Sequence, residues 1–273
     1  MDIIKKIGHN LENIKEEKPL VHCITNYITA NDCANALLAI GASPTMANNI
    51  EEVEEIEKSA SALVLNMGTL GKDSLESMIR AGKAANKFNV PIVLDPVGIA
   101  SISYRRKCAI TLLEHVKVNV IRGNISEIKA LCGLNSNAKG VDSNEVIDSN
   151  ISKEIAKDLS RRLNAIIAIT GEKDYISNGE EVIVIKNGHK LLTKVTGTGC
   201  MTTCLIGAYI GVNSNCYIGT IAGVLSMGIA GEIAFERLKD NEGSGSYRVK
   251  IIDALYNLHS DDFIRRSKIH EQI

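Results

Sequence analysis

The 273-residue chain has no tryptophan, and aromatic residues make up only 4% of it. Proteins that bind single-stranded nucleic acid stack bases on aromatic side chains, so this composition argues against such a platform. An excess of positive charge is also missing, because 31 lysines and arginines are balanced by 32 aspartates and glutamates. Such a balance gives no broad field to attract a polyanion or an anionic membrane. We therefore expect a small-molecule ligand, with no nucleic-acid or membrane partner.

Several familiar signatures are absent as well. The seven cysteines form no C-x-x-C pair and no cysteine–histidine group at zinc-finger spacing, which is typical of reduced thiols. No apolar run approaches the ~20 residues of a membrane span, and residues 1–6 contain no apolar signal core. These absences predict a cytoplasmic protein.

The common nucleotide-binding and hydrolase motifs are likewise missing. The chain has no G-x-x-x-x-G-K-[ST] sequence and no G-x-G-x-x-G after an N-terminal strand. It also lacks H-E-x-x-H and G-x-S-x-G, so metalloproteases and α/β-hydrolases have no support. A kinase without a P-loop remains compatible with the sequence.

What is present is a repeated alternation of short apolar runs and longer amphipathic stretches, which predicts an α/β fold with a mostly parallel sheet. Buried strands are predicted at residues 20–24, 62–66, 91–94, 118–121 and 165–169. Helices are predicted at residues 30–40, 72–88, 104–115, 152–163, 200–210, 216–238 and 247–258. No long linker divides these elements, so we expect a single domain over residues 1–273.

Residues 174–196 have a different pattern. They alternate in polarity and contain two Asn-Gly pairs, at 178–179 and 187–188, which favour hairpin turns. A small antiparallel edge of the sheet is therefore expected there. The tail after Asp261 is charged and is expected to be frayed.

Polar residues follow several of the predicted parallel strands, at the edge where ligands bind in such sheets. Asp95 could hold Mg²⁺ or could initiate a turn before Pro96. Arg122 and Glu127 could clamp a phosphate and a metal, or could belong to a helix cap with an ion pair. Thr170 follows another strand at the same edge.

A glycine loop, Thr196-Gly197-Thr198-Gly199-Cys200, precedes an apolar helical run. Free backbone N–H groups at a helix N-terminus suit a phosphate or an oxyanion, although a turn with an N-cap is the commoner meaning of such residues. Gly197, Thr198, Gly199 and Cys200 are therefore candidates for an anion hole. His22 is interpreted as a structural histidine, and Met46 alone would be interpreted as core packing.

Six segments together resemble the hydroxyethylthiazole kinases, a thiamine-salvage family with the ribokinase-like fold. They are HCITNY (22–27), AIGASPTM (39–46), NMGTL (66–70), DPVG (95–98), RGNISE (122–127) and TGTGC (196–200). The resemblance implies transfer of the ATP γ-phosphoryl group to the primary alcohol of 4-methyl-5-(2-hydroxyethyl)thiazole, with Mg²⁺. It also implies a homotrimer with sites between neighbouring subunits.

The resemblance assigns roles to individual residues. It implies that Arg122 and Thr170 contact ATP. It implies that Met46 and Gly197 contact the thiazole, and Asn26 is a further candidate for the substrate pocket. Asp95 and Glu127 are implied to be the acidic residues around magnesium.

Cys200 occupies the place where the wider ribokinase-like superfamily usually has a catalytic aspartate. A thiol at a helix N-terminus can ionise and act as the base, or it can simply line the pocket as a neutral group. Other functions also remain open: a kinase of hydroxymethylpyrimidine or pyridoxal, an ADP-dependent hydrate dehydratase, or a non-catalytic nucleotide-binding module.

Overall fold

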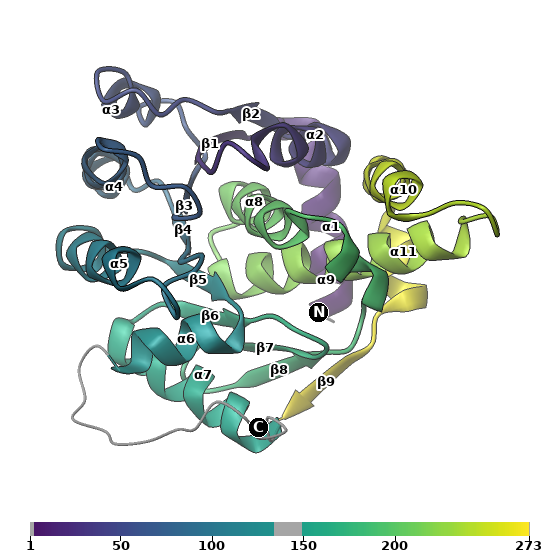
Figure 1. The fold of residues 1–273 in the computed structure, drawn as a ribbon. Helices are drawn as coiled ribbons and strands as arrows, with labels where there is room; N and C mark the ends of the chain where they lie inside the picture. The colour runs from purple at the N-terminus through teal and green to yellow at the C-terminus, as the bar shows by residue number, and fades with distance from the viewer. Residues whose placement is uncertain (1–2, 134–148, 273) are drawn as a thin grey trace.

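A computed structural model describes residues 3–133 and 149–272 of the chain (Figure 1). Its strands form one nine-stranded sheet in the order β2-β1-β3-β4-β5-β6-β7-β8-β9. The strands are β1 (Leu20–Ile24), β2 (Ser43–Thr45), β3 (Ala62–Asn66), β4 (Ile92–Asp95), β5 (Val120–Gly123), β6 (Ile166–Ile169), β7 (Asp174–Ser177), β8 (Val182–Ile185) and β9 (Ile269–Gln272).

The helices connect and cover these strands. They are α1 (Ile3–Glu17), α2 (Ala30–Ile40), α3 (Val53–Ile56), α4 (Ser74–Phe88), α5 (Ser103–His115), α6 (Ile125–Cys132), α7 (Ser149–Leu163), α8 (Thr198–Gly211), α9 (Cys216–Glu236), α10 (Ser244–Tyr256) and α11 (Ser260–Arg266), with a 3₁₀ helix η2 (Lys190–Lys194).

The direction of the strands confirms the predicted α/β architecture. Strands β1 to β6 pair in parallel, and β7, β8 and β9 continue the sheet in antiparallel fashion. Each of the five predicted buried strands corresponds to an observed one, because their Val, Ile and Leu runs are buried on both faces of the sheet. The predicted antiparallel edge is also confirmed.

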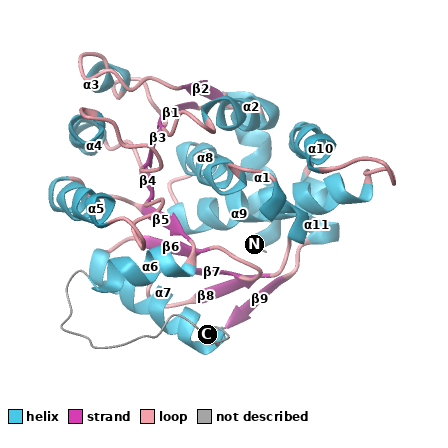
Figure 2. Ribbon diagram, viewed as in Figure 1, coloured by secondary structure: helices cyan, strands magenta, loops and turns pink. Residues whose placement is uncertain are grey.

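Two hydrophobic cores lie on opposite faces of the sheet. In β3, Val64 packs on one side with α1, α2, α8, α9 and α10, whereas Leu63 and Leu65 pack on the other with α4, α5, α6 and α7. This alternation follows from the two-residue period of a strand. Figure 2 shows the strands as a central column between these two groups of helices.

Helices α8 and α9 occupy the centre of the larger core. Both are apolar on all sides, and most residues of each are buried. The prediction that no apolar run approaches the length of a membrane span is wrong for α9, which is the one helix in the described part of the chain long and apolar enough to cross a membrane. However, 89% of its most apolar window is buried inside the fold. This helix has the character expected of a core helix.

Two details of the sequence prediction are wrong. The first Asn-Gly pair joins β7 to β8, but Asn187 and Gly188 lead into η2 and form no hairpin. The tail after Asp261 is not frayed, because α11 packs against α1 and β9 pairs with β8. The tail gains these partners only from segments distant in the sequence, so its local polarity did not reveal them. The elements α1, β2, α3, α6, η2, α11 and β9 were not predicted.

Candidate active site

The carboxyl ends of the parallel strands meet the N-terminus of α8 at one edge of the sheet. Asn66 and Asp95 end β3 and β4, Arg122 lies near the end of β5, and Thr170 directly follows β6. The register pairs Asn66 with Asp95, and Arg122 with Ala168 in β6. The structure therefore brings together side chains that are up to 104 positions apart in the sequence (66 to 170).

A cluster of side-chain amides surrounds the Cys200 thiol. Asn26 Nδ2 and Asn66 Nδ2 lie 3.3 and 3.2 Å from Cys200 Sγ, and Asn26 Nδ2 also donates to Asn66 Oδ1 at 3.0 Å. Asn66 Nδ2 lies 2.9 Å from Asp95 Oδ2. Asn66 thus connects the candidate substrate residue Asn26, the thiol and the buried carboxylate.

Asp95 is completely buried beneath this cluster. Its Oδ2 accepts a hydrogen bond from Thr203 Oγ1 and lies 3.6 Å from Arg122 Nη1. Burial is the main cause that raises the pKa of Asp95 to about 6, and the positive charge of Arg122 opposes this rise. Its Oδ1 has no hydrogen-bond partner among the described residues. Asp95 is therefore part of a side-chain network and does more than initiate a turn.

Glu127 belongs to a helix cap, which is one of the two alternatives expected from the sequence. Asn124 caps α6, and Asn124 and Glu127 form a capping box. One Glu127 oxygen accepts from the backbone N–H of Asn124 at 2.9 Å, and the other accepts from the N–H of Gly98 at 2.8 Å. The carboxylate of Glu127 is thus held in place from both sides.

The glycine loop adopts a geometry that leaves donors available. Gly197 precedes α8 with φ of +85°, and a Cβ there would lie 2.6 Å from Thr29 Cγ2, so only glycine fits without strain. Gly197 has no side chain that could cap α8, and no side-chain cap of the first N–H groups is found among the described residues. The helix dipole adds positive potential at this point.

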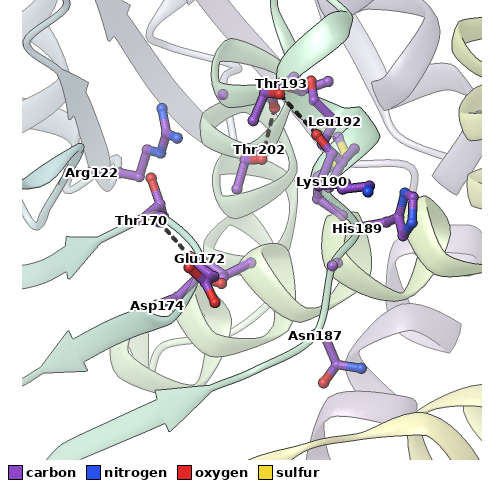
Figure 3. A pocket seen from close by; sticks show the side chains of 17 residues that line it. Arg122, Thr170, Glu172, Asp174, Asn187, His189, Lys190, Leu192, Thr193 and Thr202 are labelled. Carbon is purple, nitrogen blue, oxygen red and sulfur yellow. Dashed lines mark hydrogen bonds between the residues drawn. The ribbon is translucent and has the colours of Figure 1, made fainter. Parts of the chain in front are cut away.

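A cavity of about 820 Å³ opens beside the loop. Arg122, Thr170 and Asp174 lie on one side of it, and Lys190 and His189 on the other (Figure 3). Thr198 and Gly199 of the loop also line it. The cavity combines the side chains of Arg122, Lys190 and His189 with a helix N-terminus, which suits an anionic ligand. Two carboxyl side chains, Glu172 and Asp174, also line it.

The environment of Cys200 favours a neutral thiol. Burial is the largest effect on this group and raises its pKa, and the negative charge of Asp95 raises it further. The amide of Asn66 has the opposite influence but does not outweigh them. The lowered pKa that a helix N-terminus can give to a thiol is therefore not found at Cys200.

The family model of the hydroxyethylthiazole kinases matches residues 11–261. The chain belongs to the hydroxyethylthiazole kinase family. It is 50% identical to the hydroxyethylthiazole kinase of Clostridium tetani over 273 residues, which cover 99% of each chain. The structure of the Pyrococcus horikoshii hydroxyethylthiazole kinase superimposes with a TM-score of 0.89 at 38% identity, covering 98% of this chain and 100% of that one.

The fold is shared more widely than the family. Pyridoxal kinase from Staphylococcus aureus superimposes with a TM-score of 0.61 at 15% identity, over 93% of this chain and 98% of that one. At this identity the likeness shows the fold alone. It agrees with the predicted ribokinase-like architecture. Within that fold, the family model and the sequence identity assign this chain to the hydroxyethylthiazole kinases.

Most residues predicted for a kinase of this family lie close to the strand edge. Arg122, Thr170, Thr198 and Gly199 line the cavity, whereas Asn26 and Cys200 belong to the amide cluster beside it. Met46 lies outside the cavity, half-buried against the larger core.

Three further residues of this edge were not predicted, namely Asn66, Asp174 and Thr203. Asn66 ends a predicted strand, so the rule applied to Asp95 could have found it. Asp174 begins β7 and accepts from the N–H of Gly171 at 3.0 Å, next to Thr170. Thr203 lies inside an apolar helical run, where no sequence signal marks it.

Proposed function

We propose that this chain phosphorylates the primary alcohol of 4-methyl-5-(2-hydroxyethyl)thiazole with ATP, in thiamine salvage. Membership of the hydroxyethylthiazole kinase family supports this activity. The observation that carries the proposal in the structure is the N-terminus of α8. There, Gly199 lines the anion-suited cavity and the next residue, Cys200, belongs to the amide cluster. A nucleotide on one side and an alcohol on the other would meet at this point.

The nucleotide would occupy the cavity. The guanidinium of Arg122 supplies a fixed positive charge, and the buried Thr170 hydroxyl has no partner among the described residues, so it is available to a ligand. The first N–H groups of α8, from Thr198 to Cys200, form the anion hole. Phosphoryl transfer passes through a loose transition state, so these groups act chiefly by orientation and by neutralising charge on the equatorial oxygens.

The alcohol would bind on the other side of α8, near Asn26, Met46 and Gly197. Two amide N–H groups already point at the Cys200 sulfur, which leaves the thiol held in one place. With its pKa raised by burial, Cys200 serves as a neutral lining group that keeps the alcohol at the helix N-terminus. Proton removal from the alcohol need not precede transfer in a dissociative reaction.

Asp95 and Glu127 are the residues that would hold Mg²⁺. Asp95 Oδ1 is buried without a partner among the described residues, so it could bind the metal directly or accept from a metal-bound water. Glu127 already accepts from two N–H groups, so it would contact the metal through a water molecule. In the described part of the chain no three acidic, cysteine or histidine side chains form a metal cage. Mg²⁺ usually binds through one or two carboxylates together with substrate phosphates, so this arrangement suits it. When bound, it would neutralise phosphate charge.

The proposal extends to the assembly and its setting. A homotrimer with sites between subunits follows from the family resemblance. A single domain over residues 1–273 follows from the lack of a long linker, and a cytoplasmic location follows from the cysteine pattern and the lack of a signal core. The one continuous sheet supports the single domain. The exposed side chains of Tyr27 and Ile28, next to Asn26, support a neighbouring subunit close to the alcohol site.

The first test measures ADP release with Mg-ATP in the presence and absence of the thiazole alcohol, with the product identified by mass. Thiazole-dependent ADP formation and a product heavier by one phosphoryl group are expected. Turnover at background level would overturn the proposal. The same assay with hydroxymethylpyrimidine, pyridoxal and hydrated NADH would then choose among the alternative functions.

A further inference from the structure

His22 and Glu57 form an ionisable pair that is sealed inside the protein. Neither side chain has any solvent exposure, and His22 Nδ1 lies 2.5 Å from Glu57 Oε1. The second carboxylate oxygen, Oε2, is buried without a hydrogen-bond partner among the described residues. A buried pair of this kind is expensive to desolvate and is weak evidence for a stabilising role.

The other nitrogen of the ring contacts the segment that contains Met46. His22 Nε2 lies 2.9 Å from the carbonyl oxygen of Ala47. Because a carbonyl can only accept, Nε2 must carry a hydrogen atom and donate it. Glu57 Oε1 then fixes the other ring nitrogen, either as a carboxylate that accepts from an imidazolium or as an acid that donates to a neutral ring. In both forms the ring is held in the orientation that reaches Ala47.

The segment held in this way lies at the edge of the sheet, where it pairs with β1 alone among the described strands. Its strand β2 has only three residues, all half-buried, and lies at the edge of the sheet. Pro44 in the middle of β2 has no N–H to donate. The register places Thr45 beside His22, so the ring extends from the neighbouring strand to the carbonyl just after Met46.

We propose that His22 and Glu57 are positioning residues for the alcohol-binding segment: the Nε2–H bond to Ala47 fixes the backbone after Met46 and thereby the direction of its side chain. This inference rests on the proposed function, which places Met46 at the thiazole. Neither His22 nor Glu57 lines the cavity assigned to the nucleotide. The pair should therefore affect recognition of the alcohol and leave recognition of ATP unchanged.

The test compares KM values for the two substrates in four variants. Glu57→Leu, which leaves Nδ1 without its partner, should raise the KM for the thiazole at least about tenfold, with the KM for ATP within about twofold of wild type. Glu57→Gln retains a hydrogen-bonding group of the same size and should restore most of the thiazole KM. Tyr209→Phe is the matched control, because Tyr209 is equally buried and loses one hydrogen bond to Ser226. It should change neither KM.

The double variant His22→Phe/Glu57→Leu separates positioning from stability. Replacing a buried ion pair with apolar groups is often neutral or stabilising, so its midpoint of urea unfolding should be unchanged or higher. Its thiazole KM should nevertheless stay raised. An unchanged thiazole KM in this folded variant, or equal rises in both KM values, would overturn the inference while wild-type turnover upholds the proposed function. If the wild type itself shows no thiazole-dependent turnover, both the proposed function and this inference are wrong.

Discussion

At the scale of single residues, the site depends on polar side chains whose properties are set by burial. Asp95, Asp174 and Cys200 all have raised pKa values, and burial is the largest cause for each. Groups with strongly perturbed pKa values beside a cavity are candidates for function. At this site, burial raises the pKa of Asp174 to about 7, so this group is partly protonated near neutral pH and places less negative charge beside a polyanionic substrate.

The first prediction concerns Cys200. Burial keeps the thiol neutral, and a hydroxyl can accept from the same two amides. Cys200→Ser should therefore reduce kcat by less than ~100-fold, the lower limit for loss of a general base. Steady-state kinetics with saturating ATP measures this effect. A loss near ~10⁴-fold would instead assign Cys200 the role of the base.

The second prediction concerns Asp174, whose pKa burial raises to about 7, against the opposing N–H of Gly171 and the charge of Arg122. In the folded state Asp174 retains a proton that the unfolded chain releases near the ordinary aspartate pKa of 3.8. The free energy of unfolding should therefore fall as the pH rises from about 4 to 7, relative to Asp174→Asn, by up to about 4 kcal/mol.

Urea unfolding at several pH values checks the Asp174 prediction. The exposed Asp73 provides a control, since Asp73→Asn should leave the pH dependence of stability as in the wild type. A wild-type stability that rises between pH 4 and 7 relative to Asp174→Asn would contradict the prediction.

At the scale of elements, the site is positioned by the packing of α8 on α9. The first turn of α8 carries the glycine loop, and its body lies between β1, β3 and β4 on one side and α9 on the other. The close approach of the two helices depends on a small residue, because a Cβ at Gly223 would lie 2.6 Å from the backbone nitrogen of Ile206. A shift of α8 would displace Thr198, Gly199 and Cys200 together.

The third prediction is that Gly223→Ala destabilises the fold by about 3 kcal/mol or more, since backbone atoms cannot yield as a flexible side chain can. Thermal unfolding followed by circular dichroism measures it. Gly245 in α10 is the matched control, because it is exposed and nothing lies within 4 Å of an added Cβ. Gly245→Ala should raise stability slightly or leave it unchanged. Equal effects of the two substitutions would refute the packing argument.

At the scale of the whole molecule, the region proposed for the alcohol lies beside two exposed apolar side chains. The cavity of the proposed nucleotide site does not extend to Asn26, Met46 or Cys200. Tyr27 and Ile28 beside this region are adjacent in the sequence and are 81% and 61% exposed. A neighbouring copy of the chain would cover them.

The fourth prediction is that the protein sediments as three copies of the chain, and that Tyr27→Asp weakens this assembly and raises the KM for the thiazole at least about tenfold. Analytical ultracentrifugation and steady-state kinetics measure the two effects. Phe88 at the end of α4 is a partly exposed aromatic control, and Phe88→Asp should alter neither. A wild type that sediments as a single copy would rule out the trimer.

Local patterns in the sequence were enough to predict the order and type of most central elements. The buried strands and their crossover helices have local signals, since apolar periods and terminal residues such as Gly41 act within a few positions. The strand-end residues Asp95, Arg122 and Thr170 followed from the same signals, because parallel strands place their carboxyl ends at one edge.

Which of these side chains meet, and how each one is charged, depends on contacts between distant parts of the chain. Asn66 connects Asn26, Asp95 and Cys200 through contacts between positions as far as 134 residues apart, and the strand β9 exists because β8 offers a free edge. The His22–Glu57 pair likewise joins two segments that carry no local sign of each other. Burial and long-range hydrogen bonds arise from packing, and packing is the property that a local pattern of residues does not contain.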